Sequence, residues 1–242
     1  MSKINDHLVL IGAKSGTGKT SSLINLAPQK GVMYLNCEAG KRITFKNKYV
    51  CMTITDPMDV YQAFDEAEDM DDIHTIVVDS ISMLMDMFES VYIVGAANTR
   101  NQWGAYAQYF RNLMQDKVAN SSKQVIFTGH THDVLNEDDG IAETKVAIKG
   151  AVNKIGVEAF FSCVVATKKV SLKELSKYSN PMLKVTEEDE LLGYKHVIQT
   201  KLTKRTSQER IRAPLGMWTT NETYINSDIT LVLDRLNKYY KE

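Results

Sequence analysis

The sequence predicts an α/β fold in which a mainly parallel central sheet is flanked by helices and extended by antiparallel strands in the C-terminal half. Short apolar segments alternate with segments of helical apolar spacing in the first half of the chain. The second half is richer in strand-like segments, which favours added antiparallel strands. No repeat, low-complexity segment or Pro/Gly-rich linker divides the chain, so we expect a single domain over residues 1–242.

The predicted strands of the first half are short and apolar. Residues 74–80, HTIVVDS, are apolar almost throughout, as parallel strands covered on both faces tend to be. Similar segments lie at 7–11, 31–37 and 124–129. We expect these four segments to form the parallel part of the sheet.

Helices are predicted between these strands. Residues 56–70 carry apolar side chains at helical spacing, with Asp56 as the N-cap and Pro57 at the first helical position. Residues 102–118 place large apolar side chains along one side, and residues 19–26 form the helix that follows the first strand. Each helix therefore connects two strands of the predicted sheet.

The second half adds three predicted strands and a closing helix. The strands lie at 158–167, 196–203 and 222–227, and the helix lies at 228–240. With few helices between them, these strands are expected to pair antiparallel at one edge of the sheet.

Composition excludes several classes of protein. A hydrophobic content of 43% and a charged content of 24% are those of an ordinary globular protein, and a formal net charge of −1 does not indicate a nucleic-acid or membrane partner for the chain as a whole. Residues 56–90 are acidic with no Lys or Arg, whereas residues 145–212 carry twice as many basic as acidic side chains. Three scattered cysteines suit a reducing compartment, and no segment approaches the roughly 20 apolar residues of a membrane helix. We expect a cytoplasmic protein without a membrane partner.

The segment at 13–20, AKSGTGKT, fits the phosphate-loop pattern with Ala in place of the first Gly. Small residues allow successive N–H groups to point at a phosphate, and a helix starting near Gly18 would add its positive end. Lys19 would reach the β- and γ-phosphates. The residues predicted to bind the nucleotide are Ala13, Lys14, Ser15, Gly16, Thr17, Gly18, Lys19, Thr20 and Ser21.

A second motif completes the predicted metal site. The strand TIVVDS ends in Asp79, which has the form of a Walker B element whose carboxylate orders the magnesium shell. The hydroxyl of Thr20 would bind Mg²⁺ directly. The sequence therefore predicts binding of a nucleoside triphosphate with Mg²⁺, and its hydrolysis.

The base that activates water must lie away from the Walker B strand. Many phosphate-loop proteins place a Glu directly after the Walker B Asp, but here that position is Ser80. The segment VMYLNCEAG offers Glu38 at the end of the second strand. This arrangement resembles the RecA-like recombination ATPases, in which the catalytic Glu follows the second strand and Walker B ends in Asp-Ser.

The resemblance, over about residues 7–215 in element order, implies a RecA-like P-loop NTPase core that uses ATP and Mg²⁺. It implies that Phe45 stacks on adenine and that His130 senses the γ-phosphate at the end of the fourth strand. It also implies that Lys204 or Arg205, predicted on or just beyond the strand at 196–203, reaches the ATP of a neighbouring subunit. The predicted catalytic residues are Lys19, Glu38, His130, Lys204 and Arg205.

The size of the chain is similar to that of core-only RecA-like ATPases of bacteriophages, some of which belong to the Sak group of single-strand annealing proteins. That similarity implies a recombination, annealing or repair ATPase in the cytoplasm of a bacterial host. It implies self-association into a ring or filament, and single-stranded DNA and a single-strand DNA-binding protein as partners.

Two segments match the loops that face DNA in the resembled family, at 90–102 and 131–153. The residues expected to contact DNA phosphates are Arg100, Lys145, Lys149 and Lys154, with Tyr92 or Trp103 stacking on bases. Two alternatives remain: a RecA-like motor or helicase-loading factor with a protein partner, and a small-molecule kinase whose lid is the basic late segment.

Overall fold

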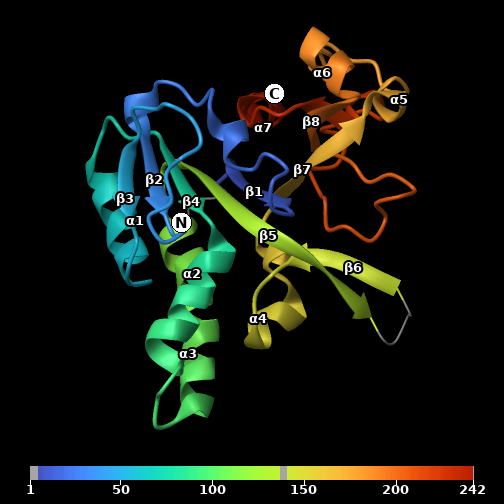
Figure 1. The fold of residues 1–242 in the computed structure, drawn as a ribbon. Helices are drawn as coiled ribbons and strands as arrows, with labels where there is room; N and C mark the ends of the chain where they lie inside the picture. The colour runs from blue at the N-terminus through green and yellow to red at the C-terminus, as the bar shows by residue number, and fades with distance from the viewer. Residues whose placement is uncertain (1–4, 137–140, 242) are drawn as a thin grey trace.

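The computed structural model of the protein describes residues 5–136 and 141–241 (Figure 1). In these residues the strands form one nine-stranded sheet with the order β3-β2-β4-β5-β1-β7-β8-β9, and β6 pairs with β5 alone. The strands are β1 (Leu8–Ala13), β2 (Val32–Asn36), β3 (Val50–Thr53), β4 (Thr75–Asp79), β5 (Gln124–Asn136), β6 (Ile141–Val146), β7 (Cys163–Ser171), β8 (Tyr194–Gln199) and β9 (Tyr224–Asn226).

The direction of the strands confirms the predicted fold class. In the order of the sheet, the neighbouring strands β3, β2, β4, β5, β1 and β7 are all parallel. Strands β8 and β9 are added antiparallel at the β7 edge, and β6 pairs antiparallel with the second half of β5. Every residue of β2 and β4 is buried, as expected for parallel strands covered on both faces.

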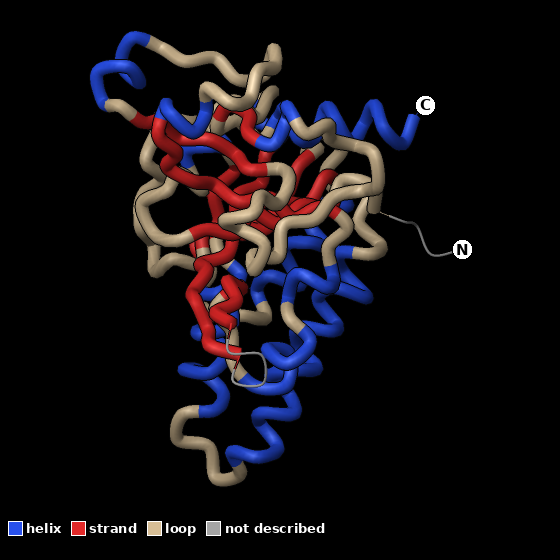
Figure 2. The backbone as a smooth tube through the Cα atoms, turned by 90° about the vertical axis from the view of Figure 1, so that its right-hand side faces the viewer, coloured by secondary structure: helices blue, strands red, loops and turns tan. Residues whose placement is uncertain are grey.

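Helices cover both faces of this sheet. The helices are α1 (Asp59–Asp69), α2 (Ile81–Phe88), α3 (Thr99–Asn112), α4 (Gly150–Ile155), α5 (Leu172–Leu175), α6 (Glu187–Leu192) and α7 (Thr230–Lys241). Side chains of α1, α2 and α3 form one apolar core with the sheet, and side chains of α7 form a second core against the opposite face. Figure 2 shows the strands running between these helices. None of the described helices is long and apolar enough to cross a membrane.

The helix predicted at 19–26 is wrong. The chain makes only a 3₁₀ turn at Ser21–Leu23. The carbonyl of Ser22 accepts a hydrogen bond from the N–H of Ile229, at 2.9 Å, and is therefore used by another element. Pro28 follows shortly afterwards and cannot continue a helix. The phosphate loop consequently lacks the long helix whose positive end was expected.

The strand predicted at 196–203 is also too long. Strand β8 ends at Gln199, whose side-chain amide turns forward and donates to the carbonyl of Lys201 at 2.6 Å and to the hydroxyl of Thr206 at 2.8 Å. These bonds fold the chain into a turn. Lys204 and Arg205 are therefore exposed on a turn, and the expected alternation along a strand does not apply to them.

Other expected boundaries move by smaller amounts. Helix α1 begins at Asp59. In the turn before it, the Asp56 carboxylate accepts from the N–H of Met58, and it also accepts from the hydroxyl of Tyr92, which lies far along the chain. The strand expected at 158–167 begins at Cys163, after a 3₁₀ turn.

The two expected DNA loops are largely regular structure. A π-helical turn at Glu89–Ile93 and the start of α3 occupy most of 90–102. The β5–β6 hairpin and α4 occupy most of 131–153, of which residues 137–140 lie outside the described residues.

Candidate nucleotide-binding site

Four parallel strands bring the predicted site together at one edge of the sheet. Ala13, the last residue of β1, lies opposite His130 of β5, and Asn36 of β2 lies opposite Asp79 of β4. Glu38 follows β2 by two residues. Because the carboxyl ends of parallel strands meet at one edge, motifs far apart in the sequence converge here.

The Asp79 carboxylate is buried and accepts three hydroxyl groups. Thr20 of the phosphate loop donates to Oδ2 at 2.8 Å, and Tyr34 of β2 donates to the same oxygen at 2.5 Å. The hydroxyl of Thr128 of β5 donates to Oδ1. Hydrogen bonds to an ionised acceptor are among the stronger ones in proteins. This carboxylate therefore ties the phosphate loop to two strands that flank β4.

Lys19 lies beneath the phosphate loop and is only 7% exposed. Its ammonium donates to the carbonyls of Ala13 at 3.2 Å and Lys14 at 3.3 Å, and lies 3.4 Å from Nδ1 of His130. Burial lowers the pKa of Lys19 from its ordinary value, while the nearby carboxylates of Asp79 and Glu38 act in the opposite direction. A buried ammonium whose partners are all uncharged acceptors is well suited to receive an anionic oxygen.

The phosphate loop itself depends on glycine at two positions. Gly16 and Gly18 have φ values of 75° and 103°, a region that side chains rarely occupy. A Cβ at Gly18 would also approach the side chains of Ser21 and His196. The His196 ring lies 3.0 Å from the carbonyl of Thr17, so β8 supports the loop from the side.

Both oxygens of the Glu38 carboxylate are engaged. Oε1 lies 2.9 Å from Nε2 of His130, and Oε2 accepts from the ammonium of Lys41 at 2.9 Å. Burial alone raises the pKa of Glu38, but the hydrogen bonds with Lys41 and His130 outweigh it, so the pKa lies below its ordinary value. Glu38 is consequently ionised and oriented toward the same space as Lys19.

The other predicted residues are dispersed. Phe45 is half-buried, with its ring edge-on to Tyr49 at 5.9 Å, and lies in a groove beside the site. Lys149 is ion-paired with Glu89 at 2.6 Å. Arg100 of α3 and Lys154 of α4 are exposed, and Lys145 of β6 is half-buried. The structure brings Lys19, Thr20, Glu38, Asp79 and His130 into one site, and Lys204 and Arg205 are not part of it in this chain.

Sequence reasoning missed three residues of this site: Tyr34, Lys41 and Thr128. Tyr34 and Thr128 each directly follow apolar residues of a strand, in VMY and VIFT, and a hydroxyl in such an apolar run was the available signal. Lys41 follows Glu38 by three residues in an irregular segment, where spacing does not predict which side chains meet.

The oxygen atoms present fit a magnesium ion. Mg²⁺ prefers oxygen ligands and is commonly bound by one or two protein groups together with substrate phosphates. The hydroxyl of Thr20 and the carboxylate of Asp79 are 2.8 Å apart at the base of the phosphate loop. Among the described residues no group of three or more His, Cys, Asp or Glu side chains is placed to hold a metal by itself.

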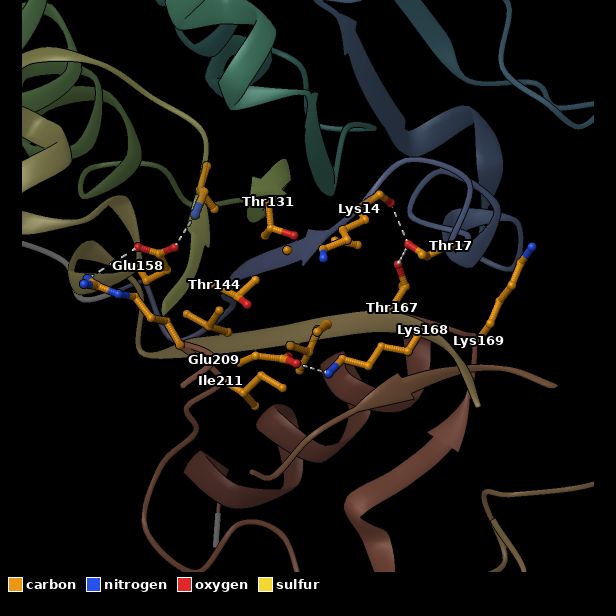
Figure 3. A pocket seen from close by; sticks show the side chains of 17 residues that line it. Lys14, Thr17, Thr131, Thr144, Glu158, Thr167, Lys168, Lys169, Glu209 and Ile211 are labelled. Carbon is orange, nitrogen blue, oxygen red and sulfur yellow. Dashed lines mark hydrogen bonds and ion pairs between the residues drawn. The ribbon is translucent and has the colours of Figure 1, made fainter. Parts of the chain in front are cut away.

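A separate cavity of about 330 Å³ lies on the β7 side of the phosphate loop (Figure 3). The hydroxyls of Thr17 and Thr167 meet at 3.1 Å in its wall, and Lys168 is ion-paired with Glu209 across another wall. Asp79 does not line this cavity. It therefore adjoins the phosphate loop without being the place where the predicted catalytic residues converge.

Comparison with known proteins adds a family assignment. A family model described as an AAA domain matches residues 6–207 of the chain. None of the curated proteins matches the chain. The matched range contains all the residues of the site described above.

The hydroxyl bonds to Asp79 can be tested by comparing two buried tyrosines. Tyr34→Phe removes the hydrogen bond to the Asp79 carboxylate, and Tyr49→Phe removes a hydrogen bond to the uncharged carbonyl of Leu23. Both bonds are 2.5 Å long. Each acceptor keeps another donor, Thr20 or the N–H of Leu26. Tyr34→Phe should lower the free energy of unfolding in urea by about 1.5–3 kcal/mol, and Tyr49→Phe by about 0.5–1.5 kcal/mol. A loss for Tyr34→Phe no larger than that for Tyr49→Phe would contradict the role assigned to Asp79.

Proposed function

The chain belongs to the AAA domain family of P-loop NTPases, and from this premise we propose that it is a Mg²⁺-dependent, RecA-like ATPase that acts on single-stranded DNA in recombination, annealing or repair. The observation that carries the ATPase proposal is the convergence of Lys19, Asp79 and Glu38 at the carboxyl edge of the parallel strands. In this proposal Lys19 supplies a cation for the phosphates, Asp79 a carboxylate for the metal, and Glu38 a carboxylate that activates water.

The chain's own groups have distinct roles in the proposed hydrolysis. Lys19 exchanges its carbonyl partners for phosphate oxygens, which stabilises charge on the transferred group. When bound, Mg²⁺ neutralises charge on the phosphates. The ionised Glu38 carboxylate accepts the proton of the attacking water, and Lys41 and His130 hold that carboxylate in place. His130 lies between Glu38 and Lys19, and we propose that it contacts the terminal phosphate.

Two substitutions separate binding from chemistry. Lys19→Ala should abolish nucleotide binding, measured with a fluorescent ATP analogue, because it removes the buried cation. Glu38→Gln should still bind nucleotide with Mg²⁺, yet turnover should fall by about 10²–10⁴-fold, as expected for loss of a general base. Lys117→Ala, at a lysine paired with Asp65, is the control and should leave both properties unchanged. Wild-type turnover in Glu38→Gln would show that the base lies elsewhere.

Self-association is proposed because Lys204 and Arg205 are exposed on a turn, where they are accessible to a neighbouring subunit. A cation supplied in this way stabilises charge that develops on the transferred phosphoryl group, and such groups can contribute about 10³–10⁵ in rate. We propose that one of these two side chains acts at the ATP of the adjacent copy.

Mixing experiments test that proposal. Turnover per protomer should rise with protein concentration, and Arg205→Ala or Lys204→Ala should lower turnover while ATP still binds. A Glu38→Gln protomer keeps its own Arg205, so mixing it with Arg205→Ala should restore part of the activity. No restoration, together with turnover that is independent of concentration, would exclude Arg205 from this role.

DNA binding is proposed for the face formed by α3, α4 and the β5–β6 hairpin. Arg100 and Lys154 are exposed there, and in the part of the chain that the structure describes their side chains make no ion pair. Lys149 is held by Glu89 and must exchange that partner to contact a phosphate. The face is therefore expected to bind the DNA backbone through a small number of cations.

The slope of affinity against salt measures those contacts. Single-stranded DNA affinity should fall as salt rises, and combining Arg100→Ala with Lys154→Ala should reduce the log–log slope by about 1.4, the amount expected for two phosphate contacts. The matched control removes two exposed lysines elsewhere, with Lys173→Ala and Lys184→Ala. Absence of DNA binding by the unaltered chain would favour a motor or helicase-loading factor whose partner is a protein.

A further inference from the structure

The backbone of His130 is held by a side chain of helix α2. The Ser82 hydroxyl accepts a hydrogen bond from the N–H of His130 at 3.0 Å and donates to the carbonyl of the same residue at 3.3 Å. Ser82 is only 8% exposed. One buried hydroxyl therefore binds both polar backbone groups of the residue that contacts Lys19 and Glu38.

The sheet explains why a helix side chain is needed at this position. Strand β4 pairs with β5 as far as Phe127, and β6 pairs with β5 only from Thr131 onward. Among the strands that the structure describes, residues 128–130 pair with β1 alone. The carbonyl of His130 also accepts from the N–H of Ala147, at 2.7 Å, whereas its N–H is bonded to α2 and not to a strand.

The start of α2 is fixed relative to the predicted metal ligand. The helix begins at Ile81, two residues after Asp79, and the side chain of Ser80 caps it. Ser82 lies in the first turn of this helix. The carboxylate that holds the phosphate loop and the hydroxyl that holds His130 are therefore carried by one short, hydrogen-bonded segment.

The His130 ring depends on the position of its backbone. Nε2 lies 2.9 Å from Oε1 of Glu38, and Nδ1 lies 3.4 Å from the ammonium of Lys19. A shift of the backbone would change both distances together. Misplacement of a functional group by about 1 Å can lower a rate by about 10²-fold.

We propose that Ser82 is a positioning residue of the ATPase, which holds His130 in place between Lys19 and Glu38. The inference rests on the proposed function and adds to it a residue whose hydroxyl is engaged by backbone rather than by nucleotide or metal. Loss of this hydroxyl should impair turnover and spare nucleotide binding, because it leaves the phosphate loop and Asp79 unaltered.

Ser82→Ala removes both hydrogen bonds to His130. Turnover at saturating ATP should fall by about 10–10²-fold, whereas the affinity for a non-hydrolysable ATP analogue with Mg²⁺ should change by less than about twofold. Ser82→Thr should restore turnover, because it keeps the hydroxyl. Its added methyl group has space, since Ser82 borders a cavity of about 460 Å³.

The matched control removes another buried hydroxyl that links β4 to β5. Thr75 is fully buried and donates to the side-chain oxygen of Gln124 at 3.0 Å, at the amino-terminal end of these strands. Thr75→Val should lower the urea concentration at which the protein unfolds, as Ser82→Ala should, but it should leave turnover unchanged.

A double-mutant cycle separates positioning from a general loss of stability. In a His130→Ala protein, Ser82→Ala should cause no further loss of turnover, because the ring to be positioned is absent. Three results would each overturn the inference: unchanged turnover in Ser82→Ala, an equal loss with and without His130, or full turnover in His130→Ala.

Nitrogen NMR of the histidine rings tests the same contact without catalysis, and decides the question if His130→Ala has no measurable turnover. In Ser82→Ala the ring resonances of His130 should shift, while those of His7, which contacts Asn237, should stay in place. Unshifted His130 resonances would also overturn the inference. Absence of ATP hydrolysis by the unaltered protein would instead overturn the proposed function, whatever the spectrum shows.

Discussion

The carboxylate of Asp79 is the group on which the geometry of the site depends. It is almost fully buried, and a buried carboxylate is costly unless its oxygens accept hydrogen bonds. Three hydroxyls from the phosphate loop, β2 and β5 meet that need, and each comes from a different segment of the chain. These hydrogen bonds thus fix the position of Thr20 relative to two strands, and the position of the predicted metal ligand becomes a consequence of folding.

A second set of polar contacts surrounds the same edge of the sheet. Lys19, His130, Glu38 and Lys41 form a chain of contacts in which cationic ammonium groups lie at both ends and the carboxylate lies within. Burial lowers the pKa of Lys19, and the hydrogen bonds around Glu38 lower the pKa of its carboxyl. Both pKa shifts follow from the same arrangement, in which Lys19 is shielded from water while Glu38 keeps its hydrogen bonds with Lys41 and His130. An anionic ligand would supply the negatively charged partner that the Lys19 ammonium lacks.

Much of this site could be predicted from the sequence, because its motifs are local. The phosphate loop, the Asp at the end of an apolar strand and Glu38 after the second strand are each visible in a few consecutive residues. Features that depend on distant residues could not be predicted. The segment expected to be a helix at 19–26 forms only a short turn, in which the carbonyl of Ser22 accepts from the distant N–H of Ile229. The donors Tyr34 and Thr128 are identified only once strand order places them beside Asp79. Roles that reside in exposed basic residues, Lys204 and Arg205 among them, remain predictions.

Strand β5 connects the site to the rest of the molecule. Its first part pairs with β1 as far as His130, and from Thr131 onward it pairs instead with β6. The change of partner occurs directly after the residue that contacts both Lys19 and Glu38. The hairpin beyond it returns to the phosphate loop, where Lys14 and Asp133 form an ion pair at 2.6 Å.

Under the proposed function, the terminal phosphate would displace His130 and so act on a continuous hydrogen-bonded strand. A movement of Lys14 toward the nucleotide would break its ion pair with Asp133. Under the same proposal, both contacts would respond to one ligand, and nucleotide binding would thereby be coupled to the proposed DNA-binding face.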